Sequence, residues 1–240
     1  MDNTFSYFYP QDKGTKKKSV EKKEKTAASS GKTAYLSFDD GPSEQTARIL
    51  DVLKRYGIKG TFFVIGKDTE FGRRMYKRIV DEGHQIGNHS YSHDYDKIYK
   101  SVDSFVNDFM KLERLLESAA GQRPRIMRYP GGSNNTVSHR AGGAGIMGDI
   151  IAEMTRRGYI HFDWNVDAGD AASAINSADL ILSNVLDQAA QKRNALILLH
   201  DAGYQKHTPA VLPQIIEGLQ SQGFGFSVLS QSSYRVQFVK

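Results

Sequence analysis

Residues 34–42 read AYLSFDDGP, and the interpretation of the whole chain starts from this stretch. The apolar run from Ala34 to Phe38 is typical of a short buried strand. It ends in two aspartates, Asp39 and Asp40, and then in a Gly-Pro dipeptide that favours a turn. Ser43 follows and can cap a helix. The stretch therefore predicts a strand, a loop and a helix, with two carboxylates at the carboxyl end of the strand.

This strand–loop–helix unit repeats along the chain. Short apolar runs alternate with longer amphipathic stretches from residue 34 to residue 229. Such alternation indicates βα units arranged around a mostly parallel sheet. Seven or eight units within about 207 residues predict an α/β fold, namely a small irregular (β/α) barrel. The expected strands are 34–38, 60–65, 85–88, 125–129, 160–166, 195–199 and 225–229, and the expected helices are 43–56, 71–82, 102–119, 150–157, 178–190 and 211–222.

Composition excludes several classes of protein. The 240 residues contain no cysteine, which rules out a disulfide scaffold, a thiolate zinc site and a cysteine nucleophile. No window approaches eighteen consecutive apolar residues, and Met1 begins a polar stretch. We therefore expect neither a membrane span nor a signal peptide within the chain as given.

Basic residues are distributed unevenly. The net charge is +5, and residues 1–33 hold eight lysines against four acidic residues, so most of the excess lies there. Residues 11–32 contain no Leu, Ile, Phe or Met and cannot bury enough apolar surface to offset the entropy of ordering. We predict a flexible Lys-rich linker or tail over 1–33 and a globular domain over 34–240. The tail is either a solvated charge run or a tether across an anionic layer such as a cell wall, and the nearly neutral domain makes a nucleic-acid partner unexpected.

Polar residues that can carry chemistry directly follow the predicted strands. In a parallel α/β barrel the carboxyl ends of the strands gather on one face, so residues up to about 160 positions apart are expected to converge there. These residues are Asp39 and Asp40 after the first strand, His89 and His93 after the third, Arg128 at the end of the fourth, Asp167 and Asp170 after the fifth, and His200 with Asp201 after the sixth.

The spacing of the two histidines favours a metal site. His89 and His93 are four residues apart, a usual spacing for two imidazoles on one divalent ion, although two surface histidines would show it too. Asp39 and Asp40 point to different sides, so one can bind a metal while the other stays free; a plain turn is the alternative. One carboxylate and two imidazoles suit zinc and also accept cobalt or nickel. Such an ion activates water and polarises a carbonyl, so amide or ester hydrolysis is the natural chemistry.

Five ordered blocks carry a resemblance to a known family. Over roughly residues 33–229 the chain resembles the NodB-type polysaccharide deacetylases, which form carbohydrate esterase family 4. The order of the blocks makes the resemblance specific, whereas any one of them alone would be weak. The blocks are SFDDGP at 37–42, HSYSH at 89–93, RYPGG at 128–132, WNVD at 164–167 with its continuation to Asp170, and LLH at 198–200.

The resemblance implies a metal site and a general base. Asp40, His89 and His93 would hold one divalent ion. Asp39 would be the general base for the metal-activated water. Arg128 would pair with Asp39 and keep it ionised.

The resemblance also implies a general acid on the other side of the acetamide group. His200 would protonate the leaving nitrogen, and a carboxylate behind it would fix the imidazole tautomer. Asp170 is the first choice for that carboxylate, and Asp167 is the second. The tryptophan that usually follows this aspartate in the family is replaced by Ala171.

Four residues are expected to contact substrate. The backbone N–H of Tyr129 would stabilise the oxyanion, and its ring, like those of Tyr91 and Tyr95, could stack on sugars. The four assigned contacts are Tyr129, Pro130, Leu198 and Trp164, and Tyr91 and Tyr95 are further candidates for stacking.

One glycine-rich stretch suggests a different ligand. Residues 143–148 read GAGIMG and fit the GxGxxG pattern of dinucleotide-binding loops. Polar residues 134–140 precede it where that motif requires a strand, so no nucleotide cofactor is expected.

Together these features predict a metal-dependent N-deacetylase acting on an N-acetylglucosamine-containing glycan, with peptidoglycan favoured by analogy and by the tether-like tail. The alternatives are a chitooligosaccharide deacetylase, an acetyl-xylan esterase, and a cell-wall-binding pseudoenzyme, against which the predicted base and acid argue. We expect a monomer outside the cell or at the wall, tethered to the membrane by a segment that would precede this chain.

Overall fold

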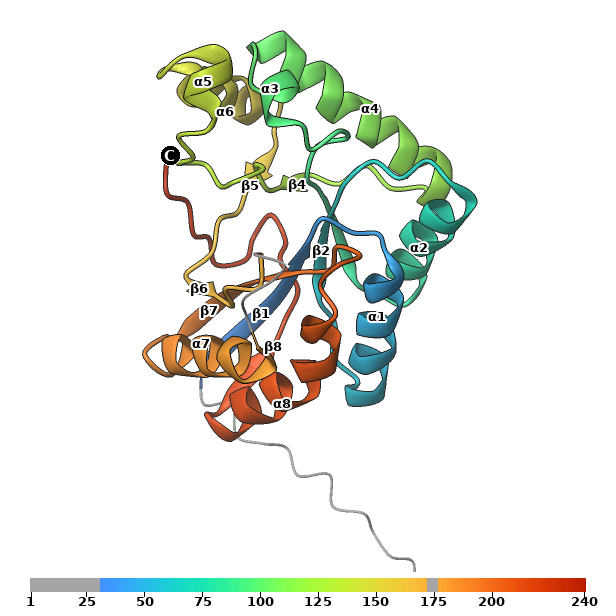
Figure 1. The fold of residues 1–240 in the computed structure, drawn as a ribbon, viewed down its shortest axis with the longest axis vertical. Coiled ribbons are helices and arrows are strands. Elements are labelled where there is room, and N and C mark those ends of the chain that lie inside the picture. The colour runs from blue at the N-terminus through green and yellow to red at the C-terminus, as the bar shows by residue number, and fades with distance from the viewer. Residues whose placement is uncertain (1–30, 172–176) are drawn as a thin grey trace, which may run out of the picture.

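A fully parallel sheet of eight strands forms the centre of the computed structural model, which describes residues 31–171 and 177–240 (Figure 1). The strand order is β5-β4-β3-β2-β1-β7-β6, and β8 pairs with the first half of β1. The predicted α/β barrel-like fold is confirmed, as a barrel whose sheet stays unpaired between β5 and β6. The predicted linker over 1–33 lies, except for its last three residues, outside the described part of the chain. The strands are β1 (Lys32–Asp39), β2 (Thr61–Val64), β3 (Gln85–Asn88), β4 (Ile126–Met127), β5 (Ile160–His161), β6 (Val166–Asp167), β7 (Asn194–His200) and β8 (Phe224–Phe226).

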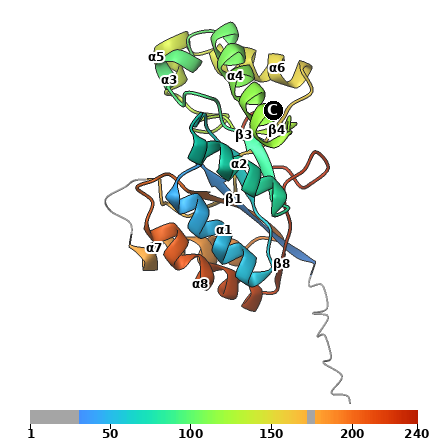
Figure 2. The same cartoon turned by 90° about the vertical axis from the view of Figure 1, so that its right-hand side faces the viewer.

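Helices cover the outside of the sheet. Neighbouring helices pack in the order α4, α2, α1, α8 and α7, and Figure 2 shows α1 in front of β1, with α2 above it and α8 below it. None of the helices within the described residues is long and apolar enough to cross a membrane. The helices are α1 (Glu44–Tyr56), α2 (Glu70–Asp81), α3 (Tyr95–Ile98), α4 (Val102–Ala120), α5 (Ser138–Gly142), α6 (Ile146–Arg156), α7 (Ala178–Ala190) and α8 (His207–Ser221).

The first βα unit forms as its sequence predicts. Ser43 caps α1: its hydroxyl accepts from the Gln45 N–H at 3.0 Å, and its own N–H donates to Thr46 Oγ1 at 2.8 Å. These two bonds satisfy backbone donors that a helix start leaves unpaired. Gly57 ends the helix in the left-handed conformation, with φ of 65°, which glycine adopts without steric cost. The start of α1 is thereby fixed directly beyond the two aspartates.

The prediction of one strand over 160–166 is wrong. The chain pairs with β4 only through β5, and the Phe162 N–H donates to Met127 O. It then crosses to the opposite edge of the sheet, where the Asn165 N–H donates to Leu196 O and β6 pairs with β7. Residues 160–166 alternate apolar and polar side chains, and this pattern does not show that the two ends of the segment hydrogen-bond to different strands.

A buried carboxylate and the chain end fill the opening between those two edges. Asp163 is fully buried and accepts hydrogen bonds from the Ser133 N–H at 2.9 Å and from the Phe238 N–H at 2.7 Å. The Val239 N–H donates to Ser133 Oγ at 3.0 Å. In Figure 1 the C-terminal segment accordingly runs from the lower to the upper half of the molecule.

Other differences concern helix ends and short elements. The helices α6 and α8 each start four residues before their predicted beginnings, and the short helices α3 and α5 are not predicted. The glycine-rich stretch 143–148 follows α5, a helix, so the strand that a dinucleotide-binding loop requires does not precede it.

Candidate active site

Arg128 is the buried residue that holds Asp39 in place at the candidate site. It is fully buried, and its Nη1 donates to Asp39 Oδ1 at 2.8 Å and to Ser37 Oγ at 2.9 Å. Its Nε and Nη2 donate to backbone carbonyls, and its guanidinium lies 4.4 Å from the centre of the Phe63 ring. Burial raises the pKa of Asp39, while Arg128 and His200 pull it back down. The carboxylate is thus held in one orientation by a fixed positive partner.

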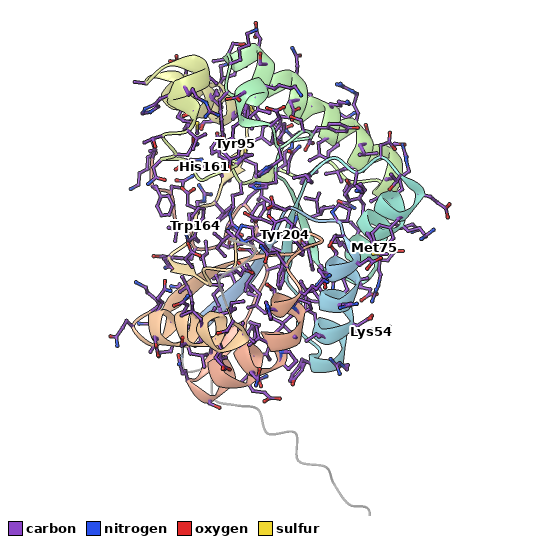
Figure 3. All side chains as sticks on the ribbon, in the orientation of Figure 1. Lys54, Met75, Tyr95, His161, Trp164 and Tyr204 are labelled. Atoms are coloured by element: carbon purple, nitrogen blue, oxygen red, sulfur yellow. The ribbon has the colours of Figure 1, made fainter. Side chains whose placement is uncertain are left out.

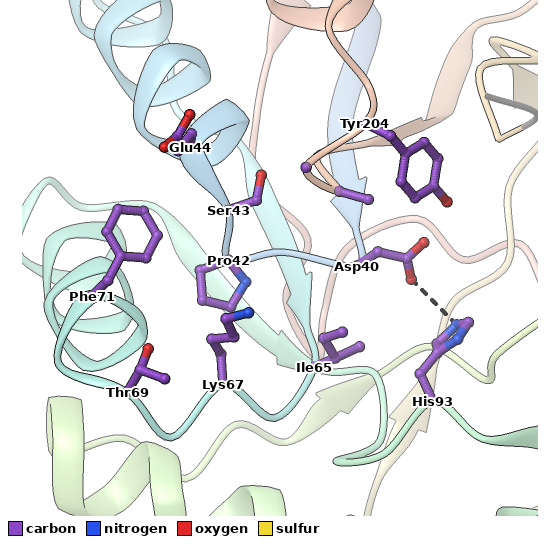
Figure 4. Close-up of a pocket in the computed structure, with 12 residues that line it drawn as sticks. Asp40, Pro42, Ser43, Glu44, Ile65, Lys67, Thr69, Phe71, His93 and Tyr204 are labelled. Atoms are coloured by element: carbon purple, nitrogen blue, oxygen red, sulfur yellow. Dashed lines mark ion pairs between the residues drawn. The ribbon is translucent and has the colours of Figure 1, made fainter. Parts of the chain in front are cut away.

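Asp40, His89 and His93 meet at the carboxyl ends of β1 and β3. His93 Nε2 lies 3.2 Å from Asp40 Oδ1, and His89 Nε2 lies 3.5 Å from the same oxygen. One ligand atom from each residue falls within 4.8 Å of the others. Figure 4 shows the Asp40 and His93 side chains pointing toward each other. The three residues expected to share a metal are therefore brought together.

The donor atoms of this cluster fit a divalent cation. His89 Nδ1 lies 2.8 Å from Arg128 O, which can only accept, so this nitrogen carries the hydrogen. Burial lowers the pKa of His89 to about 3 and keeps the ring neutral. The lone pair of its Nε2 then faces Asp40 Oδ1, a buried oxygen that has no hydrogen-bond partner even though His93 is close. Two acceptors facing each other are satisfied by a cation between them.

Helix α4 holds the loop that carries both histidines. The Asp108 carboxylate accepts from the backbone N–H groups of Tyr91 at 2.6 Å and Ser92 at 3.1 Å. Ser90 lies between the histidines in the left-handed region, with φ of 71°, and its hydroxyl accepts from the His93 N–H at 3.1 Å. Sequence reasoning missed Asp108 because it is one of several polar positions on an amphipathic helix.

A second support reaches the same loop through Asn88. Its side-chain amide donates to the buried Glu113 carboxylate at 3.0 Å, and its Oδ1 accepts from the Ser90 N–H at 2.9 Å. Burial raises the pKa of Glu113 to about 7. Neither residue stands out in the sequence, since nothing in the pattern of α4 distinguishes an inward carboxylate from a surface one.

Asp201 supports the loop that carries Asp39 and Asp40. It is fully buried, its Oδ2 accepts from Thr46 Oγ1 at 2.5 Å, and its N–H donates to Asp39 O at 2.9 Å. A Cβ atom on Gly41 would lie 2.2 Å from Asp201 Oδ2, so only glycine fits there. Burial raises the pKa of Asp201 to about 7. Its place directly after His200 is the only sequence signal for this role.

Of the two candidate partners for His200, Asp170 lies against it. Asp170 Oδ1 is 2.8 Å from His200 Nδ1, and Asp170 Oδ2 accepts from the His200 N–H at 2.9 Å and from Thr208 Oγ1 at 2.7 Å. Asp167 instead accepts from the Gly169 N–H. Burial alone would lower the pKa of His200, but the hydrogen bond and negative charge of Asp170 raise it to about 9.

These groups open on one cavity of about 350 Å³. Of the expected substrate contacts, Leu198 and Trp164 line it, together with Tyr95 and Tyr204 (Figure 3). Ala171 also lines it, at the position where the family usually has a tryptophan.

The structure argues against Pro130 as a contact and against the stacking roles of the Tyr129 and Tyr91 rings. Tyr129 borders the cavity, but its ring is 1% exposed and packs against Phe105 and His161, so the ring cannot stack on a sugar. Pro130 is buried and does not line the cavity, because the chain turns there and presents Gly131 instead. The ring of Tyr91 is turned away toward Lys111, 3.7 Å from its centre.

Comparison with known proteins identifies the family of this chain. The sequence profile of the polysaccharide deacetylase family matches residues 26–145, which is half of the chain. The chain belongs to this family. A peptidoglycan-N-acetylglucosamine deacetylase of Bacillus cereus is 32% identical over 211 residues, which cover 85% of this chain and 71% of that protein.

Two further relatives extend the comparison. The crystal structure of the catalytic domain of a peptidoglycan N-acetylglucosamine deacetylase from Eubacterium rectale superposes with a TM-score of 0.82 at 34% identity, covering 87% of this chain and 93% of that one. A bifunctional xylanase/deacetylase of Pseudobutyrivibrio xylanivorans is 32% identical over 201 residues, which cover 83% of this chain and 30% of that protein.

The close approach of Gly41 to Asp201 predicts a specific defect. Gly41→Ala should weaken zinc binding about 10- to 100-fold, because the added methyl group pushes the Asp40 loop away from the histidines. Gly41→Ala combined with Asp201→Ala removes the clash and should regain part of the affinity. Gly148→Ala, where an added Cβ meets nothing within 4 Å, is the control. Zinc affinity measured by competition with a chelating dye tests this, and an unchanged affinity in Gly41→Ala would contradict it.

Proposed function

We propose that this protein is a metal-dependent hydrolase that removes N-acetyl groups from N-acetylglucosamine residues of peptidoglycan. The observation that carries the proposal is that Asp39, His200 and the three proposed metal ligands all line one cavity. These ligands are Asp40, His89 and His93. A carboxylate, a metal-ligand set and a protonated imidazole are the groups that amide hydrolysis requires. The names of the relatives support peptidoglycan as the substrate.

The proposed metal site is formed by Asp40, His89 and His93. A divalent ion held there, with zinc favoured and cobalt or nickel as alternatives, would lower the pKa of water and polarise the acetyl carbonyl. The unpaired Asp40 Oδ1 and the neutral His89 ring support this assignment.

Asp39 is the proposed general base. Its Oδ1 is occupied by Arg128, and its Oδ2 lies 3.7 Å from His89 Nε2, beside the metal cluster. This oxygen can take the proton from the attacking water. The raised pKa of the buried carboxyl makes it a better proton acceptor than an exposed aspartate.

His200 is the proposed general acid, and Asp170 positions it. With a pKa raised to about 9, the imidazole is protonated at neutral pH. It can donate that proton to the sugar nitrogen as the C–N bond breaks, which yields acetate and a free amine. We assign the oxyanion to the backbone N–H of Tyr129, which borders the same cavity.

An acetyl-xylan esterase is the second candidate, supported by the xylanase/deacetylase relative. An ester needs His200 less, because an alkoxide leaves more readily than an amide nitrogen. A chitooligosaccharide deacetylase would use the same groups as the proposed enzyme. A pseudoenzyme that only binds the wall would need neither the ordered base nor the ordered acid. We place the protein outside the cell, where its substrate lies, and as a monomer, because one chain supplies every group of the proposed site.

Acetate release tests the proposed function directly. The protein should release acetate from purified peptidoglycan and N-acetylglucosamine oligomers, lose this activity with a chelator, and recover it with zinc or cobalt. Acetylated xylan is the comparison substrate. Release from xylan alone would favour the esterase, and no release from any substrate in the metal-loaded protein would favour the pseudoenzyme.

Variants of the base and of a metal ligand should separate rate from metal binding. Asp39→Asn is expected to lower kcat about 100-fold or more while zinc affinity stays within a few-fold, because its carboxylate is not a proposed ligand. His93→Ala should lose the metal itself. Turnover that survives in Asp39→Asn would remove Asp39 from the base role.

The paired carboxylate predicts a shift in the pH profile. Asp170→Asn removes the charge that raises the pKa of His200, so this pKa should fall by at least one unit and the alkaline limb of kcat/KM should move to lower pH. Thr208→Val removes one hydrogen bond to Asp170 but keeps the charge of Asp170. This variant should not move the alkaline limb of kcat/KM to lower pH. An alkaline limb at the same pH in Asp170→Asn would contradict the assignment.

A further inference from the structure

A larger cavity adjoins the candidate active site. Its volume is about 710 Å³. It shares Asp40, His93 and Tyr204 with the active-site cavity, so the two cavities adjoin each other at the proposed metal ligands (Figure 4). The loops after β1, β2 and β7 form its walls. A polymer that places one sugar over the cluster would extend into this second space, which we call the flanking groove.

The flanking groove combines apolar walls with two charges. Pro42, Ile65 and Phe71 provide apolar surface. Lys67 and Glu44 also line the groove and are both exposed. Within residues 31–171 and 177–240, neither has an ion-pair partner. An unpaired charge can interact with a ligand without an existing ion pair being broken, although its exposure keeps the contribution small.

The backbone of Lys67 is fixed while its ammonium group remains available. The Lys67 N–H donates to the Tyr76 hydroxyl at 2.7 Å, and that hydroxyl donates to Ile65 O at 2.5 Å. Gly72 packs against Lys67 so closely that a Cβ there would lie 2.0 Å from Lys67 O. The contacts with Tyr76 and Gly72 therefore hold the backbone of Lys67 at the groove, and Tyr76 is itself held by Ile65.

We propose that the flanking groove binds a carboxylate-bearing segment of the glycan next to the acetylated sugar, and that Lys67 recognises the carboxylate. This inference rests on the proposed function. Peptidoglycan carries carboxylates on its stem peptides and on lactyl groups that bear no peptide, whereas chitin and acetylated xylan are uncharged polymers. Glu44 repels an anion from its own part of the groove, which leaves the Lys67 side for the carboxylate. The apolar wall and the half-exposed ring of Tyr204 suit the faces of the sugar rings.

Substitution of Lys67 tests the proposal by comparing charged with neutral substrates. Lys67→Gln should lower kcat/KM and binding affinity for soluble peptidoglycan fragments about three- to fivefold, as expected for one partly solvated ion pair. The loss should shrink as salt screens the interaction. For N-acetylglucosamine oligomers the change should be clearly smaller. Glu44→Gln should improve the values for charged fragments, because it removes the negative charge that repels the carboxylate.

Lys54→Gln is the matched control, because Lys54 is exposed on the same helix as Glu44 but near its other end, away from Tyr204 in Figure 3. Fragments with and without peptide distinguish the lactyl carboxylate from the peptide carboxylates. Equal losses on charged and neutral substrates, or no loss on either, would overturn the role of Lys67. Calorimetry measures the binding of the charged fragments to Lys67→Gln and to the unchanged protein, so it tests the role of Lys67 even if no substrate is turned over. The absence of turnover would refute the proposed function and not the role of Lys67.

Discussion

Three carboxylates crowd the junction of β1 and β7, and their charge must be compensated because burial makes an unpaired charge costly. Asp39 is paired with the fully buried Arg128. The pKa of Asp201 is raised to about 7, so this group can be neutralised by a proton. Among the described residues, the ion-pair contacts of Asp40 are with two imidazoles, of which His89 is neutral. The proposed divalent cation between Asp40, His89 and His93 would compensate this charge, and the supports of the site hold these three residues together.

The register of the paired strands places the proposed catalytic residues next to one another. Asp39 pairs directly with His200 across β1 and β7, which places the proposed base and acid at the same level of the sheet. Asn88 pairs with Met127 across β3 and β4, so that His89 and Arg128 follow side by side and share a hydrogen bond. Residues far apart in sequence therefore meet through backbone pairing, and loops need only turn their side chains inward.

Much of this arrangement could be predicted from the sequence, because reactive polar residues directly follow apolar runs. The ends of β1, β3 and β7 were visible in this way, and so was the cap at Ser43. The roles of Asp108 and Asp201 in holding the site loops could not be predicted, because they depend on tertiary contacts that no local sequence pattern encodes. The break between β5 and β6 was missed because tertiary hydrogen bonding, not hydrophobicity, divides that segment.

Anomalous diffraction from crystals of the zinc-loaded protein is the most direct test of the central claim. One zinc ion is predicted about 2.0–2.2 Å from a carboxylate oxygen of Asp40 and from the Nε2 atoms of His89 and His93, with Asp39 beside it and not bound. An ion held elsewhere, or one that takes Asp39 as a ligand in place of Asp40, would contradict the account.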